Sequence, residues 1–330
     1  MPEYISTFNA EFEQIVARRI ARELAGARVI KTYGGLLHYE YGGHPADISR
    51  VPFFNNSFAV ILTFAGKDAA FDRMAAAAAR ARFGAVGGGS FRVRFSLHNR
   101  FVAAPGSAAA LAERAVIKNC GLKPDRVNPD TEFWFILRSE GVGFFGQLLK
   151  KRGVTEKSLR KGELRPELAY LLCCCVDIPP GRVICDPFAG YGSIPLQMQQ
   201  HFDFRKMFVS DIDERCVGYL RTTALGRGPD IEITRADATH LAHMADNSVD
   251  FIITDPPWGL YNRAENIAGL YESVLTEFKR VLADGGTVTL LSGAPADMAA
   301  AAGKAGFTVA ERFNVLVNGK KADVMVFTRC

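Results

Sequence analysis

The hydrophobic pattern of the second half of the chain alternates between the helical and the strand period. Short apolar runs predict strands, and the amphipathic stretches between them predict helices. Such alternation is typical of a parallel sheet with helices on both faces. The predicted strands are Arg182–Cys185, Lys206–Ser210, Ile231–Thr234, Asp250–Thr254 and Thr287–Leu291, and the predicted helices are Leu168–Val176, Ser193–His201, Asp213–Leu225, Thr239–Met244 and Ala268–Leu282.

The end of the chain departs from this alternation. Phe307–Val317 and Asp323–Thr328 are both strand-like, and the residues between them include Asn318-Gly319. Asn-Gly is a strong signal for a tight hairpin turn. We therefore expect an α/β domain whose parallel sheet is completed by an antiparallel hairpin.

The first half has an α+β pattern. A helix over Glu11–Ala25 would place Phe12, Ile15, Val16, Ile20 and Leu24 on one face. Further segments follow without regular alternation, which predicts a separate region before the α/β domain. The predicted strands are Val29–Tyr33, Leu36–Tyr41, Phe58–Phe64, Phe91–Leu97, Thr131–Arg138 and Gly143–Leu149, and the predicted helices are Phe71–Arg82 and Ser107–Cys120.

Length and composition narrow the class of protein. A chain of 330 residues is long for one domain, and 48% hydrophobic with 23% charged residues excludes a disordered or collagen-like chain. No apolar run approaches the roughly 20 residues of a membrane helix, and the first residues do not resemble a secretion signal. Seven cysteines without a Cys-x-x-Cys pair indicate reduced thiols in a cytoplasmic protein without a metal centre.

Positive charge is concentrated at one place. The net charge of the chain is +5, and the segment 150–165 alone carries seven basic and two acidic residues. This segment is either a solvated linker or a strip that contacts phosphates. With the two patterns above, this predicts four parts, namely an N-terminal α+β segment (1–55), a second α+β region (56–149), a basic linker (150–165) and an α/β domain (166–330).

A glycine-containing loop follows the first strand of the predicted parallel sheet. It reads Asp186-Pro187-Phe188-Ala189-Gly190-Tyr191-Gly192-Ser193 and leads into a helix. Glycines allow a ligand to approach the backbone, and a helix N-terminus favours a negative group. A nicotinamide dinucleotide site is a second interpretation, but Pro195 stands where its third glycine is needed.

Acidic residues follow the next two strands. Asp211 lies 19 residues after Gly192, close to the spacing of a carboxylate that binds ribose hydroxyls, and Asp237 follows the third strand. Asp211 could instead cap the following helix, and so could Asp213. Because the carboxyl ends of parallel strands meet at one edge, three acids there predict a ligand site.

The motif Asp255-Pro256-Pro257-Trp258-Gly259 ends the fourth strand. A carboxylate, a rigid turn and an aromatic ring together suit a flat heterocycle. Asp255 and the carbonyl of Pro256 could accept hydrogen bonds from both N–H groups of an exocyclic amine while Trp258 stacks on the base. The structural alternative is a rigid turn with a packing tryptophan.

These two motifs, in this order, resemble class I S-adenosylmethionine-dependent methyltransferases that act on exocyclic amines. The chain is similar in particular to the THUMP-containing tRNA guanine-N2 methyltransferases and their ribosomal-RNA relatives. Phe91-Arg92-Val93-Arg94-Phe95, the helix Ser107–Cys120 and Asn128-Pro129-Asp130 resemble the THUMP pattern, and Lys161–Ala169 resembles the segment that leads into that family's catalytic domain. The resemblance implies a Rossmann-like, seven-stranded class I methyltransferase domain with an antiparallel C-terminal hairpin, preceded by an α+β THUMP-type RNA-binding region.

The resemblance also implies a cofactor, a partner and site residues. The cofactor would be S-adenosyl-L-methionine, and the partner an RNA, with tRNA expected, for a monomer that uses neither a membrane nor a metal. The implied residues are Asp255, Pro256, Pro257 and Trp258 for catalysis; Asp186, Phe188, Gly190, Gly192, Asp211, Ile212, Asp237 and Ala238 for the cofactor; and Arg92, Arg94, Lys150, Lys151, Arg152, Arg160, Lys161 and Arg165 for RNA.

Several alternatives remain open. A tryptophan at the end of the tetrad is also found in adenine-N6 methyltransferases, and the RNA could be ribosomal. Two alternatives belong to other function classes. The protein could methylate a small molecule or a protein, or it could be an RNA-binding module with an inactive catalytic half. His240 and His243 could be taken as zinc ligands, but the surrounding sequence offers no further cluster.

Overall fold

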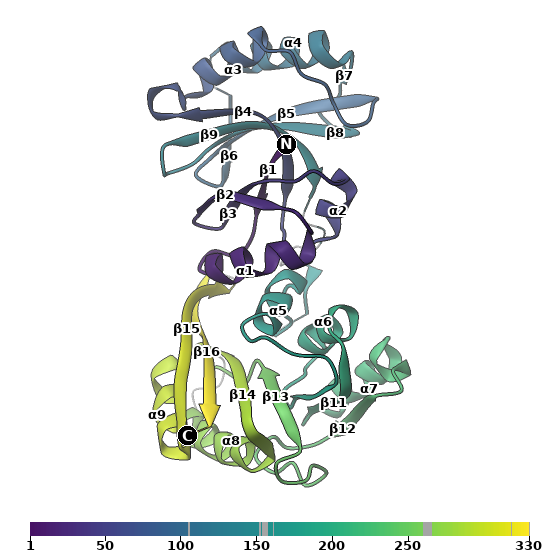
Figure 1. Cartoon of the computed structure of the whole chain (residues 1–330), viewed down its shortest axis with the longest axis vertical. Helices are drawn as coiled ribbons and strands as arrows, with labels where there is room; N and C mark the ends of the chain where they lie inside the picture. Colours follow the sequence, from purple (N-terminus) through teal and green to yellow (C-terminus); the bar gives the residue numbers. More distant parts are fainter. Residues whose placement is uncertain are drawn as a thin grey trace. The chain divides into compact units, whose positions relative to one another are not determined.

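The computed structural model describes residues 1–104, 106–151, 153, 158–160, 162–259, 266–317 and 319–329. It divides the chain into two compact units (Figure 1). The N-terminal unit comprises residues 1–8 and 17–152, and the C-terminal unit comprises residues 9–16 and 153–330. Two residues predicted to bind RNA, Arg152 and Lys161, lie outside the described residues.

The N-terminal unit is built on one mixed sheet, the N-terminal sheet. Among the described residues its order is β2-β3-β1-β4-β9-β8-β5-β6, with β7 paired to β5. It runs without a break through the two segments that the sequence analysis separates at residue 55, because β1 pairs with both β3 and β4. The strands are β1 (Glu3–Thr7), β2 (Arg28–Tyr33), β3 (Leu36–Glu40), β4 (Ser57–Ala65), β5 (Ser90–Leu97), β6 (Arg100–Val102), β7 (Lys123–Pro124), β8 (Thr131–Leu137) and β9 (Val142–Lys150).

Helices α3 (Phe71–Arg80) and α4 (Ala108–Cys120) cover one face of the N-terminal sheet (Figure 1). Their alanines approach closely, and the space between helices and sheet is filled by aromatic rings. Phe135 stacks on Phe145 with 4.3 Å between ring centroids, and both side chains are fully buried. Burying each ring stabilises the fold by about 2 kcal/mol. The remaining helices that begin in this half are α1 (Glu13–Glu23) and α2 (Pro45–Arg50).

The C-terminal unit contains the C-terminal sheet, whose seven described strands run in the order β12-β11-β10-β13-β14-β16-β15. β10 to β14 are parallel, whereas β16 is antiparallel to both β14 and β15. The strands are β10 (Arg182–Asp186), β11 (Phe204–Asp211), β12 (Ile231–Arg235), β13 (Val249–Thr254), β14 (Leu282–Ser292), β15 (Phe307–Val317) and β16 (Lys320–Arg329).

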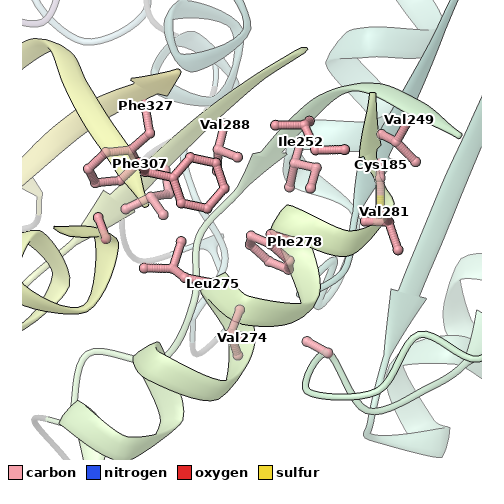
Figure 2. Packing of buried hydrophobic residues seen from close by; sticks show 14 of the residues in the cluster. Cys185, Val249, Ile252, Val274, Leu275, Phe278, Val281, Val288, Phe307 and Phe327 are labelled. Carbon is pink, nitrogen blue, oxygen red and sulfur yellow. The ribbon is translucent and has the colours of Figure 1, made fainter. Parts of the chain in front are cut away.

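Helices flank this sheet, and a large apolar core joins α8 and α9 to it. Figure 2 shows Val274, Leu275, Phe278 and Val281 of α8 on the same side as Val288 and Ile252 of the sheet. These residues recur at the spacing of one helix face, which is the pattern that predicted α8. The helices are α5 (Pro166–Cys173), α6 (Ser193–His201), α7 (Glu214–Thr222), α8 (Ile267–Val281) and α9 (Pro295–Ala305).

The predicted fold class is confirmed, including the antiparallel hairpin that completes a parallel sheet. The predicted helix over Thr239–Met244 is wrong. The Asp237 side chain accepts hydrogen bonds from the amide and hydroxyl of Thr239, and such local bonds compete with a helix. The sequence analysis also missed β1, β6, β7, α2 and α9. For α9, Pro295 at the first turn and Gly306 at the end were signals that could have found it.

Candidate active site

The strand order of the C-terminal sheet reverses beside β10, which pairs with β11 on one side and with β13 on the other. In an open parallel sheet, the carboxyl ends of the strands at such a reversal form the ligand site. Asp186 is the last residue of β10, Asp211 is the last residue of β11, and Asp255 directly follows β13. The fold therefore gathers the predicted acids at one edge.

The glycine loop after β10 is held mainly by residues at the end of β11 and on α7. The Gly190 amide donates to Asp211 Oδ2 at 2.8 Å, and the Ala189 amide donates to the Ser210 carbonyl at 3.0 Å. Gly192 adopts a left-handed φ of 88°, and a Cβ there would lie 2.7 Å from a methyl carbon of Leu220. Glycine is required at 192 by both conformation and space.

Gly190 differs from Gly192. Its φ is 51°, and a Cβ built on it meets no atom within 4 Å. The backbone there thus faces open space, as a ligand-binding loop requires. Phe188, two residues earlier, is half-buried and packs against the apolar core, while its amide donates to Asp186 Oδ1 at 3.2 Å.

Asp186 is a buried carboxyl, only 3% exposed. Its Oδ1 accepts a hydrogen bond from the Thr254 hydroxyl at 2.7 Å. Burial raises the pKa of Asp186 to about 7, although the bonds from Thr254 and the Phe188 amide act in the opposite direction. Because Thr254 immediately precedes Asp255, this bond ties the end of β10 to the start of the Asp-Pro-Pro-Trp motif.

The remaining residues predicted for the cofactor lie after β11 and β12. Asp211 is half-buried, and its Oδ1 accepts from the Asp213 amide at 2.8 Å. Ile212 beside it is 59% exposed, an unusual state for isoleucine. Asp237 is exposed and forms a turn with Thr239, whereas Ala238 is buried. The ends of β11 and β12 thus present one exposed apolar side chain, Ile212, and the carboxylates of Asp211 and Asp237.

The Asp255–Trp258 motif folds back on itself. The Trp258 indole N–H donates to Asp255 Oδ1 at 2.8 Å. Withdrawal from water raises the pKa of Asp255 to about 7; the bond from Trp258 lowers it and the charge of Asp186 raises it further. The tryptophan therefore orients the carboxyl, a contact that the sequence analysis did not predict.

Three residues outside the motif support it. The Tyr271 hydroxyl donates to the Pro257 carbonyl at 2.7 Å and lies 3.2 Å from the Ser292 hydroxyl. A Cβ at Gly293 would lie 2.5 Å from Cε3 of Trp258, so only glycine leaves room for the indole in this position. Sequence reasoning missed all three, because they come from α8 and the end of β14 and carry no local motif.

A second charged cluster lies in the N-terminal unit. Arg92 and Arg94 bind the two oxygens of Glu132 at 2.6 and 2.9 Å, Lys151 lies 3.5 Å away, and the Trp134 indole donates to Glu132 at 2.8 Å. Burial alone would raise the pKa of Glu132, but Arg92, Trp134 and Arg94 outweigh it and lower the pKa. Three residues predicted to bind RNA thus share one carboxylate.

The other described residues predicted to bind RNA have separate contacts. Lys150 Nζ donates to the Val51 carbonyl at 2.6 Å, and buried Arg165 donates to Asn9 Oδ1 at 3.3 Å. Arg160 stacks on Tyr191 and Tyr219. These residues therefore do not form one continuous strip of solvated charge.

Neither a membrane-spanning helix nor a metal-binding cluster is found among the described residues. Of the helices that the structure describes, none is long and apolar enough to cross a membrane. The same residues contain no group of three histidine, cysteine or acidic side chains arranged to hold a metal ion.

Comparison with curated proteins finds RNA methyltransferases. A tRNA (guanine(6)-N2)-methyltransferase of Thermus thermophilus is 32% identical over 216 residues, which are 64% of this chain and 64% of that protein. The human U6 snRNA (guanine-N(2))-methyltransferase THUMPD2 is 28% identical over 183 residues, 54% of this chain and 35% of that protein. The matches therefore span less than two thirds of the length of these relatives.

Comparison with solved structures gives the same fold over the whole chain. TrmN from Thermus thermophilus matches with a TM-score of 0.81 at 24% identity, covering 100% of both chains. A possible methylase from Clostridium difficile matches with a TM-score of 0.76 at 19% identity, covering 100% of this chain and 98% of that one.

A family model adds the decisive match. It covers residues 152–323, slightly more than half of the chain, and describes an RMKL-like methyltransferase domain, UPF0020. This region contains the glycine loop, the acids at the strand ends and the Asp-Pro-Pro-Trp motif. The chain therefore belongs to the RMKL-like methyltransferase domain family.

Proposed function

We propose that this protein transfers a methyl group from S-adenosylmethionine to the exocyclic N2 amine of guanine in RNA, with tRNA as the substrate. The observation that carries the proposal is the Thr254–Asp186 hydrogen bond, which joins the glycine-loop strand to the Asp255–Trp258 motif. A site for a cofactor and a site for a base would then lie on adjacent strand ends. The similarity to guanine-N2 methyltransferases supports the choice of amine.

The residues at the edge of the C-terminal sheet fit S-adenosylmethionine. The open backbone at Gly190 permits close approach, and the half-buried Asp211 suits ribose hydroxyls. Exposed Asp237 can accept a hydrogen bond from an adenine amine, while Phe188 and Ile212 offer apolar contact. When bound, the cofactor would supply a methyl group on a positively charged sulfonium, and in its ionised form buried Asp186 would supply a carboxylate of opposite charge at this edge of the sheet.

The Asp255–Trp258 motif would hold the target amine. Trp258 occupies Oδ1 of Asp255, so Oδ2 is the oxygen that accepts an N–H of the base. The Pro256 carbonyl accepts the second N–H, and Tyr271 fixes the following carbonyl, that of Pro257. Catalysis then depends on positioning an amine whose lone pair is delocalised into the ring. Because Trp258 is half-buried, one side of its indole can stack on the base.

The N-terminal unit would bind the RNA through its cations. Arg92, Arg94 and Lys151 outnumber the single carboxylate of Glu132, which leaves local positive charge for phosphates. The side chain of Lys151 is 60% exposed and is the best placed of the three. We propose a THUMP-type role for this unit, in a monomeric protein of the cytoplasm.

Nucleoside mass spectrometry tests the function directly. The purified protein is incubated with S-adenosylmethionine and unmodified bulk tRNA, and separately with rRNA. We expect N2-methylguanosine in the tRNA pool, and far less of it over the same time when Asp255→Ala replaces the wild-type protein. Methylation that requires no RNA would contradict the proposal and favour a small-molecule or protein substrate.

Adenine N6 is the second candidate amine, and the terminal tryptophan of the tetrad favours it. The same experiment separates the two, because N6-methyladenosine differs from N2-methylguanosine in mass and retention. Its appearance would retain the cofactor and the slot and change only the base.

A further inference from the structure

Arg160 lies on two aromatic rings beside the glycine loop. Its guanidinium carbon is 4.0 Å from the ring centroid of Tyr219 and 4.7 Å from that of Tyr191. The two rings meet edge to face, 5.5 Å apart at 76°. A cation placed over two rings is attracted by both, and arginine also stacks by its plane.

The two tyrosines belong to the parts that shape the loop. Tyr191 stands between Gly190 and Gly192, and Tyr219 is on α7. The same helix supplies Leu220 against Gly192, and Asp211 just before it holds the Gly190 amide. The backbone at 190 and 192 is thus held by α7 and by Asp211, which precedes this helix. The Tyr191 side chain is held by Tyr219 and Arg160.

The segment that carries Arg160 is attached to the loop at a second point. The Arg160 amide donates to Glu163 Oε2 at 2.8 Å, and the Glu163 amide donates to the Arg160 carbonyl at 3.1 Å, which closes a turn. The Leu164 amide then donates to Ser193 Oγ at 3.1 Å. Ser193 is the first residue of α6, directly after Gly192. Tyr191 and Ser193 on either side of Gly192 therefore contact Arg160 and Leu164.

We propose that Arg160 is a positioning residue that clamps Tyr191 against Tyr219 and so holds the Gly190–Gly192 backbone ready for S-adenosylmethionine. The inference rests on the proposed function, because it assumes that this loop binds the cofactor. It gives Arg160 a role distinct from phosphate contact and explains a large aromatic side chain between two glycines. The basic segment before the catalytic domain then contributes to the cofactor site.

The test measures cofactor affinity in the full-length protein. Removing a cation from two partly exposed rings weakens binding of S-adenosylmethionine roughly 3- to 10-fold. We expect Arg160→Ala to raise the KM for the cofactor by this factor, with kcat at saturation within about two-fold, as for a lost positioning contact. Arg160→Lys keeps the charge without the planar stacking and gives an intermediate KM. Arg205→Ala, at an exposed site at the amino end of β11, is the matched control and leaves KM unchanged.

Hydrogen exchange of the free protein supplies a readout independent of turnover. Arg160→Ala and Tyr219→Ala accelerate exchange in a peptide covering residues 188–194, whereas Tyr219→Phe, which keeps the ring, does not. Unchanged exchange and unchanged affinity in Arg160→Ala, beside a wild type that binds the cofactor, overturn this proposal alone. A wild type that does not bind S-adenosylmethionine overturns the proposed function and this inference with it.

Discussion

Glu132 in the N-terminal sheet and Asp186 in the C-terminal sheet are both buried carboxyls, 6% and 3% exposed, but their surroundings are opposite. Glu132 is surrounded by Arg92, Arg94 and Lys151, and its pKa is lowered. Among the described residues no cation forms an ion pair with Asp186 or with Asp255, and the pKa of each is raised to about 7.

The difference distinguishes a carboxylate that stabilises a fold from one available to a ligand. A buried charge is costly unless it is paired, so a fold retains an unpaired carboxyl at a cost in stability. Such groups concentrate at functional sites because a ligand can complete them. By this criterion Glu132 stabilises the N-terminal unit, and the unpaired carboxyls support the proposal that the strand ends of the C-terminal sheet form the site.

The largest expected effect comes from removing Asp255. Asp255→Ala deletes the group proposed to hold the target amine and should lower the rate of methyl transfer roughly 10²- to 10³-fold. Single-turnover transfer to tRNA measures the rate, and binding of S-adenosylmethionine should remain close to that of the wild type. Asp230→Ala, an exposed acid just before β12, serves as the control. Loss of cofactor binding along with turnover would contradict this assignment.

Removing Glu132 should instead damage stability. Glu132→Gln leaves Arg92, Arg94 and Lys151 close together without their shared carboxylate, and the free energy of unfolding should fall by about 2–4 kcal/mol. The chain has two tryptophans, so a Trp258→Phe background leaves Trp134 as a fluorescent reporter of the N-terminal unit in urea. Glu113→Gln breaks the ion pair with exposed Arg126 and should cost less than about 1 kcal/mol. Equal losses of unfolding free energy in Glu132→Gln and Glu113→Gln would contradict the structural role assigned to Glu132.

The smallest effect is a difference in pH dependence between the units. Asp186 and Asp255 have pKa values above the ordinary 3.8, so between about pH 4 and pH 7 these two groups bind more protons in the folded C-terminal unit than in the unfolded chain. Their contribution to the free energy of unfolding should therefore fall as the pH rises through this range. The contribution of Glu132, whose pKa is lowered, is present above its ordinary pKa and is lost as the pH falls below it.

Single-tryptophan variants allow the pH dependence of the free energy of unfolding to be measured separately for each unit. Trp134→Phe leaves Trp258 to report on the C-terminal unit with its own site intact, and Asp255→Asn in that background should make the slope between pH 4 and pH 7 shallower. A slope unaffected by this substitution would mean that Asp255 is ionised in the free protein throughout that range.

The sequence was sufficient for the architecture where local pattern and long-range packing agree. The face of Phe12, Ile15, Val16, Ile20 and Leu24 is buried as predicted, and β15 pairs with β16 as the predicted antiparallel hairpin. The predicted helix over residues 239–244 was wrong, because the Asp237 side chain forms a local turn with Thr239. Elements whose signal is weak in isolation, such as the short strand β1, were missed because their pairing partners lie far along the chain.

For the site, the sequence predicted residue types and strand ends but not contacts. The positions of Asp186, Asp211 and Asp255 follow from sheet topology, which the alternating pattern reveals. That Trp258 binds Asp255, that Tyr271 holds Pro257, or that Arg160 stacks on Tyr191 depends on side chains brought together from distant segments. The local periodicity of the sequence does not predict these contacts.

The space that Gly293 leaves beside Trp258 has a consequence for the evolution of such sites. Any side chain at 293 would displace the indole, and with it the N–H that orients Asp255. Tryptophan at 258 and glycine at 293 should therefore be inherited together. In related chains that carry a residue larger than glycine at the position of Gly293, we expect a different aromatic residue at the position of Trp258. The presence of both residues in a newly determined sequence would then indicate that its tryptophan is oriented as it is here.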